Sequence, residues 1–406
     1  MTIEKIRIRD LLSRKINGEW GNDKSSSDGV KVLRTTNFTN TGKIDYANIV
    51  ERDIEKSLVE NKKVLYGDII IEKSGGSPNQ PVGRVVYFDY EGDEIFLCNN
   101  FTTILRTNEK IYNKYFFYHL FFNHITKRTL KYQNKTTGII NLQLERYLDE
   151  IILLPDKIIQ QKIVAILDKA DGLRRKRQQA MGLLDEFLRS TFLEMFGDPV
   201  KNPRGWEKRP LEKIGMILTG NTPPRSKSDF YGDYIEWIKS DNINTNDFYL
   251  TKAREYLSKK GKTVGRVVPP GSILVTCIAG SKDCIGNVAI ADREVAFNQQ
   301  INAIVPNESV KSKFLFAQFL YSKKLVQSYA TDSMKGLLIK SKFNKINFIC
   351  PPLHIQNQFT VIFESVERTR ERMQKSLEEM ENLFNSLMQR AFKGELQLNE
   401  NGDETR

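Results

Sequence analysis

The sequence predicts an α+β fold in which two similar α/β-mixed domains are joined by an antiparallel pair of long coiled-coil helices. Three observations predict it. The chain repeats itself after about 200 residues, each copy contains short β-rich runs followed by one helix, and a long apolar-periodic stretch follows each of two prolines. A repeat of this size indicates paired domains, because solenoid repeats run to roughly 20–50 residues.

The repeat is carried by short phrases that recur in the same order. Gly67-Asp68-Ile69-Ile70-Ile71 in the first copy corresponds to Gly271-Ser272-Ile273-Leu274-Val275 in the second. The other matched phrases are Asn99-Asn100 with Asn298-Gln299, Gly138-Ile139 with Gly336-Leu337, and Pro155 to Gln160 with Pro351 to Gln356.

Each copy has the composition of a mixed domain. In the first, residues 64–71 predict a turn that leads into a strand, and the runs at 83–88 and at Phe96 with 101–105 predict two more strands. An amphipathic stretch at 115–130 predicts a helix. The second repeats this order, with strands at 273–278, 286–291 and 301–305 and a helix at 313–329. Strands and helices do not alternate, so we expect α+β rather than a doubly wound parallel sheet.

Two long helices are expected after Pro155 and Pro351, since proline favours the first turn and neither stretch has a proline in its interior. The predicted segments are a first domain at 1–154, a helix at 155–198, a second domain at 199–350, a helix at 351–395 and a polar tail at 396–406 that we expect to be disordered. The first helix leads into the second domain and the second leaves it, which predicts antiparallel packing. The basic run at 174–177 would then approach Glu378, Glu379 and Glu381, unless both are simply solvated.

The composition favours a polyanionic partner. The 406 residues carry a formal charge of +12 with a pI of about 9.3, although solvated surface lysines explain such a charge almost as well. Four cysteines without a CxxC and three histidines make structural zinc unlikely. No signal peptide and no membrane span are expected, so we predict a cytoplasmic protein.

No catalytic motif stands out. The sequence lacks a GxxxxGK[ST] phosphate loop and an Asn-Pro-Pro-aromatic tetrapeptide. Asp68, Glu72 and Lys73 hint at a nuclease site, but Glu72 and Lys73 are adjacent in a strand and point to opposite faces. His119 and His124 have no nucleophile nearby in sequence. A serine-based site stays an open alternative, and we predict no metal ligands and no catalytic residues.

Polar and basic loops recur at matching places in both copies and are the candidates for DNA contact. Glycine lets the backbone approach phosphates, and Lys, Arg, Asn and Gln can read base edges. Drifting surface loops would have the same appearance, so this alternative stays open. The predicted DNA-binding residues are Arg34, Asn37, Lys73, Ser74, Asn79, Gln80, Arg84, Lys135, Thr136, Arg225, Lys227, Lys239, Asn242, Ser281, Lys282, Asn287 and Lys335.

These features together resemble the specificity (S) subunit of type I restriction-modification systems, over essentially the whole chain. The resemblance is carried by two proline-led helices (LLPDKIIQQKIVAILDKADGLRRKRQQ and CPPLHIQNQFTVIFESVERTRERMQ) and by Phe196-Gly197-Asp198-Pro199. The paired Gly138 and Gly336 loops and the phrase from Trp206 to Pro223 add to it. The first copy departs from the pattern at its abrupt opening, Trp20-Gly21.

The resemblance implies a non-catalytic subunit that contacts double-stranded DNA. Its two target-recognition domains would each read half of a split sequence, and the helices would set the gap. It also implies two methyltransferase (modification) subunits that bind S-adenosylmethionine and restriction subunits that use ATP and magnesium, with no cofactor on this chain. Two other hypotheses remain: a stand-alone DNA-modifying enzyme with degenerate motifs, and a coiled-coil protein scaffold.

Overall fold

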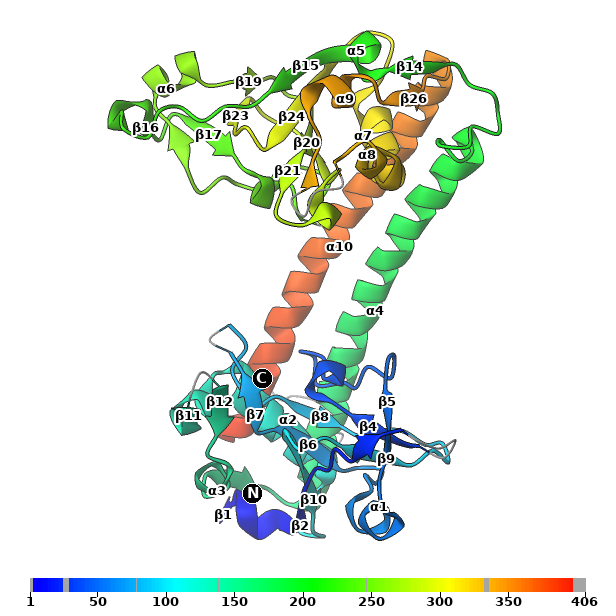
Figure 1. Ribbon diagram of the computed structural model, residues 1–406. Coiled ribbons are helices and arrows are strands. Elements are labelled where there is room, and N and C mark those ends of the chain that lie inside the picture. The colour runs from blue at the N-terminus through cyan, green and yellow to red at the C-terminus, as the bar shows by residue number, and fades with distance from the viewer. Residues whose placement is uncertain are drawn as a thin grey trace. The chain divides into compact units, whose positions relative to one another are not determined.

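The structure is a computed structural model that describes residues 3–24, 29–77, 79–136, 139–245, 247–331 and 336–396 (Figure 1). The chain forms two compact units: unit 1 comprises Met1–Arg177 with Ser376–Arg406, and unit 2 comprises Gln178–Lys375. Two long helices, α4 (Lys157–Phe196) and α10 (Leu353–Lys393), each contribute one half to each unit. Unit 1 therefore contains segments from both ends of the sequence, whereas unit 2 is continuous.

In its described residues, unit 1 contains four small sheets. Their strand orders are β2-β10-β6-β8, β3-β5-β4-β9, β11-β12-β7 and β1-β13, and all neighbours are antiparallel except β4 and β9. The strands are β1 (Glu4–Arg7), β2 (Leu12–Asn17), β3 (Asn22–Asp23), β4 (Val30–Leu33), β5 (Val50–Asp53), β6 (Ile69–Glu72), β7 (Ser74–Gly76), β8 (Val85–Tyr87), β9 (Phe96–Cys98), β10 (Thr102–Thr107), β11 (Gln133–Thr136), β12 (Ile139–Leu142) and β13 (Ile151–Leu154). The short helices are α1 (Lys56–Lys62), α2 (Asn113–Ile125), α3 (Leu144–Tyr147) and the 3-10 turns η1 (Ile8–Leu11), η2 (Thr35–Asn37) and η3 (Arg128–Tyr132).

Unit 2 repeats this plan. Its sheets have the orders β15-β24-β20-β22, β16-β18-β17-β23-β19, β14-β26 and β21-β25, and β17 and β23 are again parallel. The strands are β14 (Lys208–Pro210), β15 (Gly215–Thr219), β16 (Tyr231–Gly232), β17 (Ile235–Ile238), β18 (Tyr256–Leu257), β19 (Val267–Val268), β20 (Ile273–Thr276), β21 (Ile278–Ala279), β22 (Val288–Ile290), β23 (Val295–Phe297), β24 (Ile301–Pro306), β25 (Gly336–Leu337) and β26 (Asn347–Ile349). The short helices are α5 (Leu211–Ile214), α6 (Lys259–Val264), α7 (Ser312–Tyr321), α8 (Lys323–Ser328), α9 (Lys340–Asn344), η4 (Ser228–Phe230), η5 (Ser240–Asn242) and η6 (Lys282–Cys284).

The repeated phrase at Gly67 and Gly271 begins the central strand of each unit. Both glycines have a positive φ, 88° and 86°, which explains why glycine recurs there. In unit 1 the next residues alternate between two cores. Ile69 and Ile71 face the cluster that contains α2, and Ile70 faces a second cluster with Phe96. A strand that is buried on both faces reads as a continuous apolar run, as this one does.

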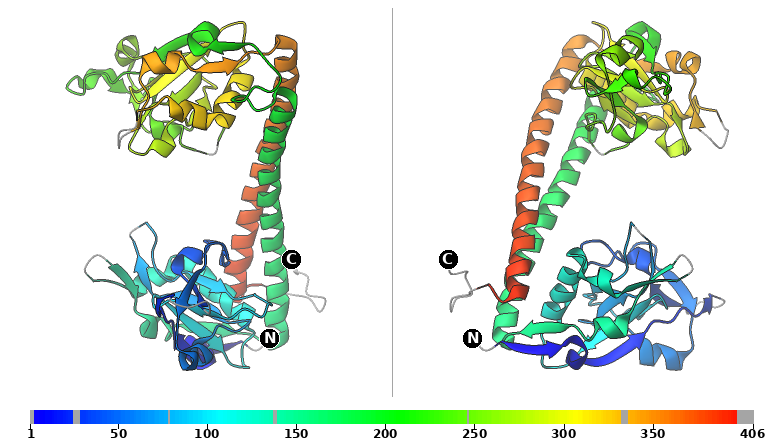
Figure 2. Two further views of the ribbon diagram at one scale, coloured as in Figure 1. Left: turned by 45° about the vertical axis from the view of Figure 1, so that its right-hand side comes forward. Right: turned by 90° about the vertical axis from the view of Figure 1, so that its left-hand side faces the viewer.

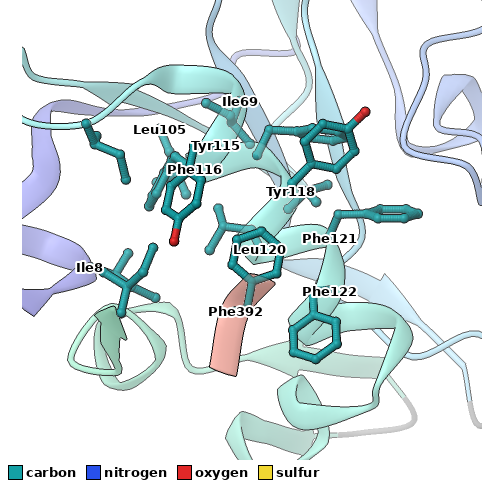
Figure 3. Packing of buried hydrophobic residues seen from close by; sticks show 14 of the residues in the cluster. Ile8, Ile69, Leu105, Tyr115, Phe116, Tyr118, Leu120, Phe121, Phe122 and Phe392 are labelled. Carbon is teal, nitrogen blue, oxygen red and sulfur yellow. The ribbon is translucent and has the colours of Figure 1, made fainter. Parts of the chain in front are cut away.

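Helix α2 is the centre of the unit 1 core, and the end of α10 packs on it. The ring of Phe392 lies 5.3 Å from Tyr115 and 5.6 Å from Phe122, measured between centroids (Figure 3). The predicted helix at 115–130 was too long, because Lys127 adopts a left-handed conformation with φ 61° and a 3-10 turn follows. The predicted helix at 313–329 is likewise divided into α7 and α8 at Ser322.

A buried glutamine explains the recurrence of Pro155 to Gln160 and Pro351 to Gln356. Gln160 Nε2 donates to Pro155 O at 2.8 Å, and its Oε1 accepts from the amide of Tyr112, which caps α2. Gln356 repeats both bonds with Pro351 O and the amide of Lys311. Each glutamine therefore fastens the start of a long helix to the short helix in the core.

The two long helices pair in antiparallel fashion within each unit (Figure 2). In unit 1, Arg174 of α4 lies over Phe384 of α10, 4.6 Å from the ring centroid. In unit 2, Phe192 of α4 packs 5.4 Å from Phe359 of α10, between centroids. Later residues of α4 thus meet earlier residues of α10, which confirms the predicted fold class. Arg174 and Arg175 are held by Asp171 of their own helix, at 2.6 and 2.9 Å.

Candidate nucleic-acid interface

The two units hold their polar loops on the same backbone frame. In unit 1 the carbonyl of Phe101 accepts hydrogen bonds from the amides of Lys73 and Ser74, at 2.9 and 3.2 Å. In unit 2 the carbonyl of Gln300 accepts the equivalent bonds from Cys277 and Ile278, at 2.8 and 3.0 Å. In unit 1 the turn before β10 therefore bonds to the loop after β6. In unit 2 the turn before β24 bonds to the loop after β20 in the same way.

The side chains at this shared point differ. Phe101 is 43% exposed, whereas Gln300 accepts from Ser240 Oγ at 3.4 Å and from Asn298 Nδ2 at 2.9 Å. The neighbouring Gln299 is exposed and accepts a hydrogen bond from the hydroxyl of Thr222. An exposed ring offers an apolar surface to a base or a thymine methyl, whereas amides offer both donors and acceptors. These three residues were not predicted as site residues, although the Asn99-Asn100 and Asn298-Gln299 repeat pointed to these turns.

Asn37 and Asn242 occupy equivalent buried positions and are 3% and 5% exposed. Asn37 Oδ1 accepts from the amide of Arg34 at 3.0 Å, and Asn242 Oδ1 accepts from the amide of Lys239 at 3.0 Å. Their amide nitrogens donate to carbonyls, Asn37 to Asp45 and Asn242 to Lys252, both at 3.0 Å. Their burial argues against the predicted DNA contact, because both side chains are used to close the 3-10 turns η2 and η5.

Replacing Asn242 by alanine is expected to lower the stability of unit 2 by about 1–3 kcal/mol, since the buried backbone groups that it bonds would lose their partners. DNA sequence preference should stay as it is. Urea unfolding followed by hydrogen exchange in β17 measures the first effect, and selection from random duplexes measures the second. Loss of preference with unchanged stability would contradict the structural role.

Arg84 is also an internal residue and is 8% exposed. Its Nε and Nη2 donate to the two carboxylate oxygens of Glu72 at 2.9 and 3.0 Å. Its Nη1 and Nη2 also donate to the carbonyls of Phe38 and Thr35, at 3.1 and 3.0 Å. The predicted DNA contact of Arg84 is therefore not supported, because the guanidinium is taken up by β6 and η2. Its counterpart in unit 2, Asn287, is half-buried and donates to Asn244 Oδ1 at 2.7 Å.

The loop after β6 brings several predicted residues of unit 1 together. Lys73 Nζ donates to Asn17 Oδ1 at 2.9 Å, and burial lowers the pKa of Lys73. Ser74 donates to Asn141 of β12, and Asn79 and Gln80 are exposed. Lys73 lies just before β7, Ser74 lies on β7, and Asn79 and Gln80 follow it.

The remaining predicted residues are spread over other loops. Arg34 is half-buried and donates to Asn48 O at 2.8 Å. Ser281 and Lys282 are exposed at η6, where Ser281 Oγ accepts from the amide of Asp283 at 3.2 Å. The backbones of Lys135 and Thr136 pair with Ile140 and Ile139 in β11 and β12, but their side chains lie outside the described structure, as does the whole of Lys335.

Arg225 and Lys239 meet over two aromatic rings in unit 2. The Arg225 guanidinium lies 4.5 Å from the ring centroid of Tyr231 and 5.0 Å from that of Trp237, and Lys239 Nζ lies 5.0 Å from Trp237. Glu255 accepts from both cations, and the bond from Lys239, with that from Arg225, lowers the pKa of its carboxyl. Lys227 lies apart from this cluster, over Phe230 at 5.5 Å. Trp237, Tyr231 and Glu255 were not predicted, because no local pattern links them.

Neither a metal-binding cluster nor a membrane-spanning helix is found in the part of the chain that the structure describes. Among these residues, no group of three or more His, Cys, Asp or Glu side chains is placed to hold a metal ion. In the same residues, no helix is both long and apolar enough to cross a bilayer.

The chain is similar to specificity subunits of type I restriction enzymes. It is 33% identical over 171 residues to the type I restriction enzyme HindI specificity subunit of Haemophilus influenzae, which covers 40% of this chain and 36% of that protein. The match to the Methanocaldococcus jannaschii MjaIX specificity subunit is 30% identical and covers 34% of this chain and 31% of that protein. The alignments thus span about a third of these relatives. The Escherichia coli EcoBI specificity subunit is 22% identical over 96% of this chain and 90% of its own length.

Two solved structures share the fold over nearly the full length. A chain from a study of complex assembly and conformational transition of the type I R-M system has a TM-score of 0.58 and 18% identity, covering 97% of this chain and 98% of that one. The S subunit of a type I restriction-modification system from M. genitalium has a TM-score of 0.55 and 13% identity, covering 97% and 96%.

A family model settles the assignment. The model for the type I restriction modification DNA specificity domain matches residues 5–180 and again residues 203–382, so each copy of the internal repeat is one such domain. This confirms the predicted resemblance and the prediction of a specificity component rather than an enzyme. The chain belongs to the type I restriction-modification DNA specificity family.

Proposed function

We propose that this chain reads a bipartite DNA target for a type I restriction-modification complex, with one half-site for each unit. The globular regions at 1–154 and 199–350 would be the readers. The observation that carries the proposal is a shared frame with different side chains on it. Phe101 stands where unit 2 has Gln300, and Arg34 stands where it has Lys239. Two modules that read different sequences require this combination.

The long helices would set the gap between the half-sites. Helices of 40 and 41 residues are each about 60 Å long at ~1.5 Å per residue. One turn of duplex DNA measures about 34–36 Å. The antiparallel packing found within each unit supports a stiff two-stranded spacer built from residues 155–198 and 351–395.

Partner subunits belong to the same proposal. On α4 the side chains of Leu183 and Phe187 lie one turn apart and are 58% and 52% exposed, which favours burial against another protein. We place two methyltransferase subunits with S-adenosylmethionine and restriction subunits with ATP and magnesium in this complex, and no cofactor on this chain. A cytoplasmic location stays part of the proposal.

Lengthening the spacer tests the proposed ruler. Seven residues are inserted into α4 after Arg177 and seven into α10 after Lys375, because a heptad keeps the coiled-coil register. The insertions add about 10 Å, so the selected gap should grow by about three base pairs while both half-sites keep their sequences. The measurement is selection from random duplexes with the chain purified together with its partner subunits.

The control carries the same seven residues appended after Arg406 and should leave the gap unchanged. A gap that stays constant in the helix variant would contradict the ruler. If no sequence is selected by the wild-type complex, the recognition role itself is wrong.

A further inference from the structure

In unit 2, Arg225, Lys239 and Glu255 form a cluster on the surface. The side chain of Arg225 is held there by several contacts although it is exposed. Arg225 is 55% exposed at its side chain, yet its guanidinium lies 4.5 and 5.0 Å from the centroids of two rings, and its Nη2 donates to Glu255 Oε2 at 2.8 Å. Long cationic side chains on a surface usually keep their rotamer freedom, and that freedom is lost when a partner binds and fixes them. This side chain is already ordered.

The rings beneath Arg225 are fixed to the loop that carries it. Tyr231 donates its hydroxyl to Pro223 O at 2.6 Å, and Trp237 Nε1 donates to Asn221 O at 3.3 Å. Asn221 in turn donates from Nδ2 to Val264 O at 2.8 Å and accepts at Oδ1 from the amide of Arg266 at 2.8 Å. The loop, the rings and the guanidinium therefore form one fixed assembly.

Charge and donor count leave the cluster able to bind an acceptor-rich partner. Two cations share one carboxylate, so one net positive charge remains. A guanidinium has five N–H donors, and within the described residues Glu255 is the one hydrogen-bond partner of Arg225. The remaining donors lie on a plane whose orientation is set by the rings below.

In the described structure, unit 1 keeps the frame but has other residues at the positions of the cluster, and its own ring-bound arginine, Arg52, lies over Trp20 at 4.4 Å and pairs with Asp23. The parallel pair β4–β9 of unit 1 corresponds to the parallel pair β17–β23 of unit 2. In this comparison Leu33 occupies the position of Ile238, and Val32 occupies the position of Trp237. On the neighbouring strand, Val50 pairs with Val32, whereas the carbonyl of Glu255 accepts from the amide of Trp237. The fold of the repeat thus does not require an aromatic ring or an acid at these positions, so their presence in unit 2 is specific to that unit.

We propose that Arg225 is the guanine-reading residue of unit 2, oriented by Trp237, Tyr231 and Glu255. Arginine reads guanine by donating two hydrogen bonds to O6 and N7 in the major groove, which requires a guanidinium plane of fixed direction. Lys239 lies beside it as a neighbouring cation suited to a phosphate. The assignment rests on the proposed recognition function, because it names the contact by which one half-site is read.

The experiment is selection from random duplexes by the full chain purified with its partner subunits, comparing the wild type with three variants. Arg225→Ala should lose a guanine preference at one base pair of one half-site, by roughly 10- to 100-fold, and leave the other half-site intact. Arg225→Lys should recover affinity but not that preference, because an ammonium lacks the planar pair of donors. Thermal unfolding of each variant reports on any change of fold.

Lys260→Ala is the matched control, since Lys260 is an exposed lysine of the same unit that pairs with Asp229. It removes the same charge, and any loss of affinity should be uniform across sequences. If Arg225→Ala keeps every base preference while the wild type selects two half-sites, the assignment of Arg225 is wrong and the proposed function stands. If the wild type selects no sequence, both are wrong.

Discussion

Replacing Arg84 by methionine is expected to lower the stability of unit 1 by about 3–5 kcal/mol, because it leaves a buried carboxylate without its partner. Glu72 is 2% exposed, and each of its carboxylate oxygens accepts a hydrogen bond from Arg84. The carbonyls of Thr35 and Phe38 lose a donor at the same time. Hydrogen exchange in β6 and β8 under increasing urea measures the effect, with unit 2 as the internal standard.

A double variant separates charge from packing. Combining Arg84→Met with Glu72→Leu removes both charges, so it should recover a large part of the loss, as buried pairs replaced by apolar side chains often do. In unit 2, Asn287→Ala at the equivalent position should cost only about 1–2 kcal/mol, because its two hydrogen-bond partners, Asn244 and Lys323, are exposed and half-buried and can bond to water instead. A single Arg84 variant that costs less than about 1 kcal/mol would show that the pair is not needed.

Phe392→Ala is expected to destabilise unit 1 by about 3–5 kcal/mol, the usual cost of removing a buried phenylalanine ring. Phe392 is 6% exposed and packs on Tyr115 and Phe122 of α2 (Figure 3). Its ring also meets that of His119 edge-on, with 5.3 Å between the centroids. The side chain comes from the end of α10, yet it completes the core of unit 1. Hydrogen exchange should therefore show lost protection in α2 and unchanged protection in β20 of unit 2.

Leu383→Ala on the same helix is the control, since Leu383 is 56% exposed and should change stability by less than about 0.5 kcal/mol. Equal loss of protection in both units after Phe392→Ala would mean that the residue supports the long helices as a whole rather than the core around α2.

The sequence predicted the frame well because the frame is what the two copies share. Gly67 and Gly271 recur since both need a positive φ, and Gln160 and Gln356 recur since both fasten a long helix to the core. The ends of the shorter helices were less predictable. The apolar stripe continues past Lys127, and only the left-handed backbone there ends the regular helix.

The same criterion also selected residues that the structure uses to hold its own backbone. Asn37 and Asn242 were predicted as DNA contacts because they recur, but they recur because each closes a 3-10 turn. Recurrence marks residues that the fold needs, whereas residues that read different half-sites should differ between copies. Trp237 and Glu255 are such residues, and they meet only through the pairing of β17 with β18.

Because unit 1 is built from both ends of the chain, its core cannot be completed until translation is nearly finished. Its core needs Phe384 and Phe392, which are made only after the whole of Gln178–Lys375 has been synthesised. At roughly 5–20 residues per second, that segment takes about 10–40 s to translate. Unit 2 has its whole chain at the end of this interval, whereas the apolar face of α2 in unit 1 stays uncovered throughout it. The nascent chain is therefore most exposed to chaperones and to aggregation through its first-made half.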